Sequence, residues 1–514
     1  MHVAADGGLA RLRLPGGVLT TSQLRQVAAA ARDLGSAVLE LTSRANLQLR
    51  GLPHPSPPAT TTSSDLPDPS PPATGMSRGG AGMSRGDTGA SFAERMAAAG
   101  LLPSATHERV RNIVASPLAG RAAESVLDVR SLVAELDRRL CARPALAALP
   151  GRFLFALDDG TGDVTTLDAD VTLIPADVLG FETPVSEARG SEVRGFGAGR
   201  EGEPVVGLLL SGVDAGLRVP LSGAVAGMLA VAEAFLDERA AQGSGAWRLA
   251  ELADGPARVA ARLAATDAET AARTGTGTGT DSGTGADTGA DAGKWRAVGR
   301  RVGRPVGVVE QRDGGFALVV LVPLGRLTAA QAELLAEAAA AGGGEVRVTP
   351  WREAVVPDLP WAEAERWAAT LAGAGLVTDP ASPYQGMTAC AGRPGCAKSL
   401  ADVRADAADA ADAADAAGAA DAAGAVADVA DVADVPVSVG SGGAGPRVSD
   451  GVEGAATLPV HWAGCERRCG RPAGRVVDVV ATGYGYRVDL DGTSRDFTDT
   501  RETGAAVMAA RRRR

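Results

Sequence analysis

Cysteine is scarce in this chain, and so are aromatic residues. Five cysteines among 514 residues, with aromatics at 3%, exclude the disulfide-rich scaffolds of small secreted domains, and a reducing cytoplasm fits such a chain best. No basic region followed by an apolar stretch opens the sequence, and apolar runs of about 18 residues are missing. We therefore expect neither a targeting segment nor a membrane-spanning helix.

Positive charge and histidine are also limited. The formal net charge is −11, which argues against a general nucleic-acid-binding protein. The four histidines offer few metal ligands, and only His107 and His461 lie close to other motifs. The glycines of Gly195–Gly199 lack the strand–glycine–helix context of a nicotinamide site. A nicotinamide site within this chain is therefore not expected, and any electrons from such a cofactor would have to come through a separate protein.

What the chain has in excess is alanine, glycine and aspartate, concentrated in segments of low complexity. Residues 53–91 are rich in Pro, Ser and Thr, residues 264–297 hold a Thr-Gly repeat, and residues 401–434 repeat Ala-Asp units. The first two segments cannot bury enough apolar surface to fold and are expected to be disordered. The third has good helix formers without an apolar stripe larger than alanine. We expect an exposed helix at most, and we expect its deletion to leave folding intact.

Outside these segments the sequence repeats itself. In both copies a short strand leads through a glycine-containing turn to a helix that is capped by threonine and ends at glycine, and a second strand follows. The residues shared by the two copies are Pro15, Leu19, Thr20 and Gln23 in the first, and Pro323, Leu327, Thr328 and Gln331 in the second. A strand–helix–strand unit used twice predicts a pseudo-twofold molecule with a ligand site between its halves.

Four of the cysteines form two close pairs. Cys390 and Cys396 are spaced C-x5-C, and Cys465 and Cys469 are spaced C-x3-C. Four thiolates can hold a [4Fe–4S] cluster or a structural zinc ion, although zinc sites usually use shorter spacings than that of the first pair. Unrelated thiols, or one disulfide in each pair, are the simpler alternatives. Cys141 has no nearby partner and is interpreted as an ordinary thiol.

The residues around both pairs, TACAGRPGCAKSLADV and GCERRCGRP, resemble the paired cysteine signature of the nitrite/sulfite reductase superfamily. The repeat PGGVLTTSQLRQVAAAARDLGSAVLELTSRANLQLRGL is similar to the ferredoxin-like half-domain of that superfamily. The resemblance implies that Cys390, Cys396, Cys465 and Cys469 bind one [4Fe–4S] cluster, and that the last cysteine can bridge to a sirohaem iron. Arg468 departs from the pattern, since the superfamily usually has glycine or another small residue there.

The resemblance also implies an α+β fold with two pseudo-symmetric ferredoxin-like half-domains, mixed α/β reductase-like domains and disordered inserts. The predicted order is a first half-domain over 1–52, an insert over 53–91, an α/β domain over 92–263, a linker over 264–297, a second half-domain over 298–360, and a cluster domain over 361–510 that contains the Ala/Asp-rich insert at about 401–434.

A set of side chains that bind an anionic substrate, or the carboxylates of a tetrapyrrole, is implied in the same way. A guanidinium suits this role, because it stays charged and can clamp a carboxylate with two hydrogen bonds. The matching positions are Arg44, Gln48, Arg111, Asn112 and Arg152. Arg152 takes the place of the first lysine in the family's K-F-K motif, and Leu154 stands in place of the second. Arg13 and Arg50 are expected to be solvated.

The missing second lysine weakens an interpretation as a sulfite or nitrite reductase, in which both lysines help to protonate the substrate. LPGRFLFALDDGTGDV, and GAWRLAEL around Trp247, look more like a sister family, the precorrin-3B synthases of aerobic cobalamin biosynthesis. That family implies a monooxygenase that takes precorrin-3A, O2 and reducing equivalents (formally NADH), hydroxylates C20 and closes a γ-lactone. It also implies a second iron centre, for which His107 and His461 are candidate ligands.

Two alternatives remain open at this point. One is a sirohaem-dependent sulfite or nitrite reductase, and the other is a non-catalytic binding protein that is held together by zinc or by a cluster. The residues that act directly in catalysis, the electron donor and the ligands of the second iron are not predicted by the sequence.

Overall fold

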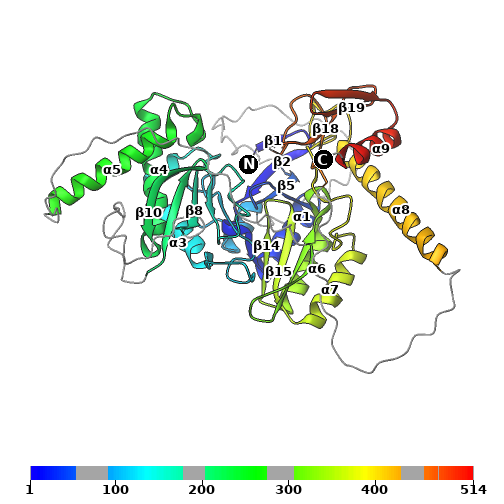
Figure 1. Cartoon of the computed structure of the whole chain (residues 1–514), viewed down its shortest axis with the longest axis horizontal. Coiled ribbons are helices and arrows are strands. Elements are labelled where there is room, and N and C mark those ends of the chain that lie inside the picture. The colour runs from blue at the N-terminus through cyan, green and yellow to red at the C-terminus, as the bar shows by residue number, and fades with distance from the viewer. Residues whose placement is uncertain are drawn as a thin grey trace, which may run out of the picture.

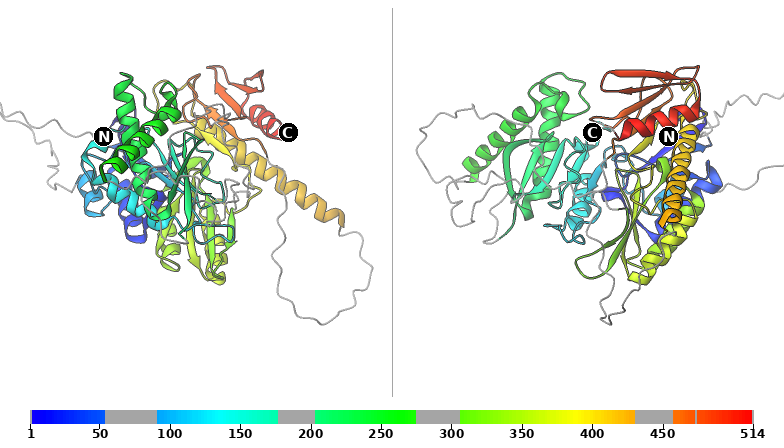
Figure 2. Two further views of the ribbon diagram at one scale, coloured as in Figure 1. Left: turned by 60° about the vertical axis from the view of Figure 1, so that its left-hand side comes forward. Right: turned by 45° about the vertical axis from the view of Figure 1, so that its right-hand side comes forward.

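The computed structural model describes residues 2–53, 91–176, 203–274, 306–429, 457–472 and 474–512. Nearly all of the predicted insert over 53–91, most of the predicted linker over 264–297, the Gly195–Gly199 cluster and His54 lie outside these ranges. Figure 1 shows the two half-domains in the centre, the middle domain with α4 and α5 on one side, and the C-terminal domain with β18, β19 and α9 on the other. The two further views in Figure 2 agree with this arrangement.

The first half-domain is an antiparallel sheet with one helix. Its elements are β1 (His2–Ala4), β2 (Gly7–Leu12), β3 (Val18–Thr20), α1 (Thr21–Leu34), β4 (Val38–Leu41) and β5 (Leu47–Leu52). Helix α1 begins at a capping box, in which the Thr20 hydroxyl accepts the Gln23 N–H and the Gln23 side chain accepts the Thr20 N–H. The helix ends before Gly35, as predicted.

The second half-domain repeats this design. Its elements are β11 (Gly307–Glu310), β12 (Phe316–Leu321), β13 (Arg326–Thr328), α6 (Ala329–Ala340), β14 (Glu345–Val348), β15 (Glu353–Leu359) and α7 (Trp361–Gly373). Thr328 and Gln331 form the same capping box as their counterparts in the first copy. The predicted repeat and the predicted α+β fold with two half-domains are therefore confirmed.

The two half-domains exchange one short strand each. β3, from the first copy, pairs with β14 of the second, and β13, from the second copy, pairs with β4 of the first. The resulting five-stranded sheets have the orders β1-β2-β5-β4-β13 and β11-β12-β15-β14-β3. Each exchanged strand follows a tight glycine turn, η1 (Pro15–Gly17) or η6 (Pro323–Gly325). Because of this exchange, neither half has a complete sheet of its own. Helices α1 and α6 also pack together, in one core that both halves share.

The middle domain is built on a third five-stranded sheet, in the order β10-β9-β8-β7-β6. Its elements are α2 (Phe92–Ala98), β6 (Ile113–Ala115), α3 (Arg130–Cys141), β7 (Phe155–Leu157), β8 (Val171–Pro175), β9 (Val205–Leu210), β10 (Val213–Pro220), α4 (Ala224–Ala241) and α5 (Gly255–Thr274). Helix α4 is buried on nearly all sides, so it is a core helix of this domain. Helix α5 extends to Thr274, past the linker boundary predicted at 264.

The C-terminal domain carries both cysteine pairs. Its elements are β16 (Met387–Ala389), α8 (Val403–Val429), β17 (Val460–Ala463), β18 (Val477–Ala481), β19 (Tyr486–Leu490), β20 (Thr493–Phe497) and α9 (Thr500–Arg511). The strands form a sheet in chain order, in which β16, β17 and β18 are parallel and β18, β19 and β20 are antiparallel.

Helix α8 corrects the expectation for the Ala/Asp-rich segment. Ala407 and Ala411 are fully buried in the same core as Trp462, because residues four apart share one face of a helix. The aspartates contribute as well, since the Tyr384 hydroxyl donates to Asp412 at 2.9 Å. The start of the segment is therefore part of the domain. Alanine is too small to form a recognisable apolar stripe in a sequence, yet it lets a helix lie close against a sheet.

No helix within the described ranges is both long enough and apolar enough to cross a membrane.

Candidate functional site

Both cysteine pairs follow neighbouring parallel strands of the C-terminal sheet. Cys390 comes directly after β16, and Cys465 lies shortly after the end of β17. Since Ala389 lies opposite Trp462 in the parallel register, both loops leave the same edge of the sheet. The contact between them is direct, because the Gly464 N–H donates to Cys390 Sγ at 3.2 Å. Two segments that are far apart in the sequence are thus joined at their cysteines.

The second cysteine pair lies on a tight turn. The Arg468 N–H donates to the Cys465 carbonyl at 3.1 Å, and Arg468 has a φ of 45°. This left-handed conformation favours glycine, which accounts for the small residue that the superfamily usually has there. The Arg468 side chain lies 2.7 Å from Asp489 and 3.5 Å from Asp478. These two ion pairs fasten the loop to β19 and β18.

The donor set fits a thiolate-bound metal group. All five cysteines are free, so neither pair is a disulfide, and Cys469 is exposed. The hydrogen bond from the Gly464 N–H to Cys390 Sγ is of the kind that sulfur ligands of iron–sulfur clusters accept. Across the described parts of the chain, no group of three or more His, Cys, Asp or Glu residues is arranged to hold a metal ion. The two cysteine loops are in contact, but their four sulfur atoms are not arranged as ligands of one metal group. Binding of a single cluster by all four cysteines therefore stays a prediction.

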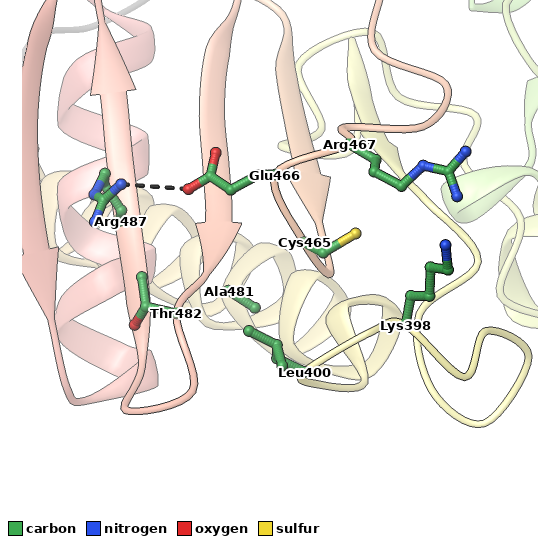
Figure 3. A pocket seen from close by; sticks show the side chains of 8 residues that line it. All are labelled: Lys398, Leu400, Cys465, Glu466, Arg467, Ala481, Thr482 and Arg487. Atoms are coloured by element: carbon green, nitrogen blue, oxygen red, sulfur yellow. Dashed lines mark hydrogen bonds and ion pairs between the residues drawn. The ribbon is translucent and has the colours of Figure 1, made fainter.

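An open pocket of about 490 Å³ lies beside Cys465. Its lining consists of Lys398, Leu400, Cys465, Glu466, Arg467, Ala481, Thr482 and Arg487. Figure 3 shows the Cys465 sulfur, the Lys398 ammonium and the Arg467 guanidinium directed toward the same side. Within the described residues, neither of these two cations makes a hydrogen bond or ion pair, whereas Glu466 accepts a hydrogen bond from Arg487 at 3.3 Å. The pocket therefore presents two cations, unpaired among the described residues, next to the Cys465 thiol.

A buried carboxylate fastens the first cysteine loop to the first half-domain. Glu40, on β4, is 9% exposed and accepts hydrogen bonds from Arg404 Nη1 and Arg50 Nε. Arg404 Nε also donates to the Cys390 carbonyl at 3.0 Å, and Arg50 Nη1 donates to the Gly395 carbonyl at 3.2 Å. Burial acts to raise the pKa of Glu40, but Arg404 and Arg50 outweigh it and lower that pKa. Arg50 is thus a structural link and not the solvated residue that was expected.

Five arginines gather where the first half-domain meets the middle domain. They are Arg11, Arg13, Arg44, Arg152 and Arg248, called here the arginine cluster. Burial, followed by the charges of Arg248 and Arg152, lowers the pKa of Arg44 to about 10. Burial, followed by Arg11 and Arg44, lowers the pKa of Arg13 to about 10. Carboxylates offset part of this charge, since Arg248 pairs with Asp170 and Arg152 lies 3.8 Å from Glu251. The cluster has more arginines than paired carboxylates, so it suits a ligand that brings further negative charge.

Sequence reasoning missed three members of the arginine cluster, which are Arg11, Arg13 and Arg248. Arg13 was expected to be solvated, but its Nε is buried and has no hydrogen-bond partner among the described residues. Arg248 donates to Asp170 at 2.8 Å, and Asp170 is fully buried. The WRL motif around Trp247 was the signal that could have identified Arg248. Nothing in the local sequence distinguishes Arg13, which directly follows β2, from an exposed arginine.

Two of the predicted ligand-binding residues have internal partners. Arg111 is 4% exposed and forms a bidentate pair with Asp137, at 2.7 and 2.8 Å. The Asn112 amide donates to the Gly151 carbonyl at 3.1 Å, and it thereby holds the loop that carries Arg152. In this structure both residues therefore stabilise neighbouring parts of the protein, Arg111 through Asp137 and Asn112 through the Gly151 loop. A direct contact of either residue with the substrate stays a prediction.

Gln48 connects the arginine cluster with the first cysteine loop. Its Oε1 accepts a hydrogen bond from Arg11 Nε at 3.0 Å, and its Nε2 donates to Glu40 at 2.7 Å. The side chain is 8% exposed. Gln48 therefore lies between the two parts of the site, with both ends of its amide occupied.

Leu154 gives the site an apolar wall. The side chain is 3% exposed and lies in a cluster with Ala45 and Val114, against which Trp351 packs. The Leu154 N–H donates to Asp170 at 2.8 Å, which fixes the backbone. The position that carries the second lysine in the resembling reductases is thus filled by buried hydrocarbon.

The two histidines singled out as candidate iron ligands differ in environment. His107 uses both ring nitrogens, since Nδ1 lies 3.0 Å from the Ser104 hydroxyl and Nε2 lies 3.0 Å from the Arg143 carbonyl. His461 is fully buried, and its Nδ1 lies 2.9 Å from the Thr388 hydroxyl. Among the described residues no group hydrogen-bonds to His461 Nε2. Of the two, His461 lies beside the second cysteine pair, since its ring is near enough to the Cys469 backbone to interact with it.

Comparisons with known proteins agree with this architecture. The profile of the nitrite/sulfite reductase ferredoxin-like half-domain matches residues 2–55 and 309–374, which are the two copies that exchange strands. Ferredoxin–nitrite reductase of Synechococcus elongatus is 26% identical over 502 residues, a span that covers 94% of this chain and 77% of the relative.

A solved structure gives the same fold. The Mycobacterium tuberculosis NirA protein superposes with a TM-score of 0.52 at 18% sequence identity, over 95% of this chain and 76% of that one. At this identity the likeness concerns the fold alone. The paired half-domains and the α/β elements around them are thus an established architecture.

Proposed function

Because this chain carries the ferredoxin-like half-domain of the nitrite/sulfite reductase family twice and is related to nitrite reductases, we propose that it is an iron–sulfur oxidoreductase whose substrate is a tetrapyrrole with several carboxylates. More narrowly, we propose the precorrin-3B synthase reaction of aerobic cobalamin biosynthesis. In that reaction precorrin-3A is hydroxylated at C20 and a γ-lactone is closed. The electrons would come from NADH through a separate donor protein in the cytoplasm.

The observation that carries this proposal is the pairing of the arginine cluster with the buried Leu154. Five arginines in one place suit a ligand with many carboxylates, which can be a tetrapyrrole substrate or a tetrapyrrole cofactor. Reduction of a small anion such as nitrite needs a cation to deliver protons at the second lysine position. There the chain has a leucine that is 3% exposed, packed near Trp351. The site therefore favours a tetrapyrrole as the substrate.

In this proposal the residues of the chain have separate tasks. Cys390, Cys396, Cys465 and Cys469 would hold a [4Fe–4S] cluster, which when bound supplies single electrons. Arg44, Arg13 and Arg152 would fix the carboxylates of the macrocycle, while Leu154 and Trp351 would exclude water from its face. One atom of O2 enters the substrate as the new hydroxyl group and the other leaves as water, so two electrons and two protons are consumed for each turnover.

The test is a product assay. The anaerobically prepared enzyme would be incubated with precorrin-3A, a reductant and ¹⁸O2, and the tetrapyrrole would be analysed by mass spectrometry. We expect one labelled oxygen atom in a hydroxylactone product. Unchanged precorrin-3A, together with consumption of nitrite or sulfite in a parallel assay, would contradict the proposal.

A second candidate is a sirohaem-dependent nitrite or sulfite reductase. It is favoured by the sequence comparison, since a ferredoxin–nitrite reductase is similar to this chain over 94% of its length. Members of that family use a [4Fe–4S] cluster together with sirohaem, and the arginine cluster would then bind the carboxylates of the cofactor. A zinc-containing, colourless protein would instead indicate a non-catalytic binding role.

A further inference from the structure

The two half-domains carry equivalent turns, and one of these turns presents an arginine. The Ala45 N–H donates to the Thr42 carbonyl and the Arg352 N–H donates to the Thr349 carbonyl, both at 3.2 Å. The φ angles are 53° at Ala45 and 66° at Arg352. A left-handed conformation costs a residue with a side chain roughly 1–2 kcal/mol. Ala45 has a small side chain and only completes its turn. Arg352 places a long charged side chain at the equivalent strained position, which suggests that the guanidinium has a function.

The Arg352 side chain occupies the boundary between the halves. A Cβ atom added at Gly325 would lie 2.6 Å from Arg352 Cδ and 3.1 Å from the Leu41 carbonyl. The glycine of η6 therefore leaves room for this arginine beside the turn that leads from β4 to Arg44. The neighbouring Trp351 packs against the apolar cluster of Ala45 and Leu154. The turn that carries Trp351 and Arg352 thus lies against the site described above.

No negative charge within the described residues compensates Arg352. No carboxylate or carbonyl there accepts a hydrogen bond from its guanidinium. Burial, followed by the positive charge of Arg404, lowers the pKa of Arg352. Arg404 itself is different, because it pairs with Glu40. A guanidinium in partial burial without a counter-charge is costly, and an anionic ligand would remove that cost.

We propose that Arg352 is an anion-binding residue of the ligand site, contributed by the second half-domain, and that it binds a carboxylate of the molecule held by the arginine cluster. This inference rests on the proposed function, because it requires a ligand with several carboxylates. The first half-domain and the middle domain would hold the ligand through Arg44 and its neighbours, and the second half-domain would hold it through Arg352. Trp351 would offer an apolar surface beside the bound carboxylate.

The experiment measures the affinity of the full-length, cluster-loaded protein for uroporphyrin, a tetrapyrrole with a carboxylate on every side chain. Fluorescence titration would compare wild type, Arg352→Gln, Arg352→Lys and Arg44→Ala. We expect Arg352→Gln to raise Kd by about 10- to 100-fold, since a hydrogen bond to a charged group contributes roughly 1.5–3 kcal/mol. Arg352→Lys should recover part of the affinity. The control Arg475→Gln, which breaks an exposed pair with Asp491, should bind as wild type.

Iron content and the electron paramagnetic resonance spectrum are recorded for every variant. An Arg352→Gln protein that binds uroporphyrin as tightly as wild type would overturn the inference and leave the proposed function standing. Loss of iron or an altered cluster signal, with unchanged affinity, would assign Arg352 to the cluster and would also overturn it. If wild type and all variants fail to bind uroporphyrin, the proposed function fails and the carboxylate role of Arg352 fails with it.

Discussion

At the residue scale, the site depends on which arginines are paired. Arg44 and Arg13 have lowered pKa values, because burial and neighbouring cations outweigh the nearby Asp170 and Glu108. Arg111 and Arg50, in contrast, form direct ion pairs with Asp137 and Glu40. All are arginines near recognisable motifs, and the sequence treats them alike. Only burial and partners separate the arginines that we propose to bind a ligand from those that support the fold.

Arg111→Ala should therefore act on stability. Removing one partner of a buried pair leaves a carboxylate uncompensated, at a cost of about 3 kcal/mol. Urea unfolding would measure this loss. The control Arg130→Ala removes an exposed pair with Asp128, whose side chains are 41% and 45% exposed, and should cost less than about 1 kcal/mol. If Arg111→Ala unfolds like wild type and loses only ligand affinity, Arg111 contacts the substrate directly.

The loop after β7 contains acidic groups whose protonation should be visible in the stability. Burial, followed by the charge of Asp158, raises the pKa of Asp163 to about 8, and burial raises the pKa of Asp158 to about 6. The pKa of an aspartate in the unfolded chain is about 3.9. Between that pH and about pH 8 the folded protein therefore binds more protons than the unfolded chain. Stability should fall as pH rises from about 4 to about 8 and then become level.

Asp163→Asn tests this expectation. The variant removes the ionisation and keeps an acceptor for the Ser116 hydroxyl, which donates to Asp163 at 2.6 Å. Urea midpoints at pH 5 and pH 8 should differ less in the variant than in wild type. Asp168→Asn, at an exposed position of the same loop, is the matched control and should keep the wild-type difference. An unchanged difference in Asp163→Asn would contradict the assignment.

At the element scale, the sequence predicted features that depend on neighbouring residues, such as helix caps. It did not predict which helix faces are buried by tertiary packing. The threonine caps of α1 and α6 were predicted because a cap depends on residues three positions apart. The burial of α8 was missed because alanines carry little hydrophobic signal. Neighbouring strands β16 and β17 bring Cys390 to Gly464, and the spacing of the cysteines alone could not show this pairing.

The correction for α8 changes what a mutation there should do. Ala411→Glu would place a charge at a fully buried position and should destabilise the protein by more than about 2 kcal/mol. Ala413→Glu, on the exposed side of the same helix, should change stability by less than about 0.5 kcal/mol. Urea unfolding and iron content would be measured for both. Equal stability of the two variants would mean that α8 is not docked on the domain.

At the scale of the whole molecule, the exchange of β3 and β13 makes one body of the two half-domains. The repeat was visible in the sequence because matched residues recur in the same order. The exchange was not visible, since each exchanged strand has three residues and pairs with a partner hundreds of residues away. The ion pair between Glu40 and Arg404, and the hydrogen bond from Arg50 to the Gly395 carbonyl, add the C-terminal domain to this body.

Gly17→Ala should weaken the contact between the two half-domains. A Cβ atom at Gly17 would lie 2.0 Å from the Val348 carbonyl oxygen, so η1 would have to move away from β14. Gly212→Ala is the matched control, because its φ of 76° is as strained but nothing lies within 4 Å of the added atom. The control should cost about 1 kcal/mol, and Gly17→Ala several times more, by thermal unfolding. Similar losses in both variants would contradict the tight contact between the halves.

The central claim, a cluster held by two cysteine pairs beside a tetrapyrrole-binding site without a resident sirohaem, is tested most directly by the visible spectrum of the anaerobically purified protein. The account predicts a broad iron–sulfur absorption that bleaches on reduction, lacks sharp macrocycle bands, and disappears in a Cys390→Ser variant. Strong sirohaem bands would show a reductase with a bound tetrapyrrole cofactor, and a colourless protein would contradict the iron–sulfur assignment itself.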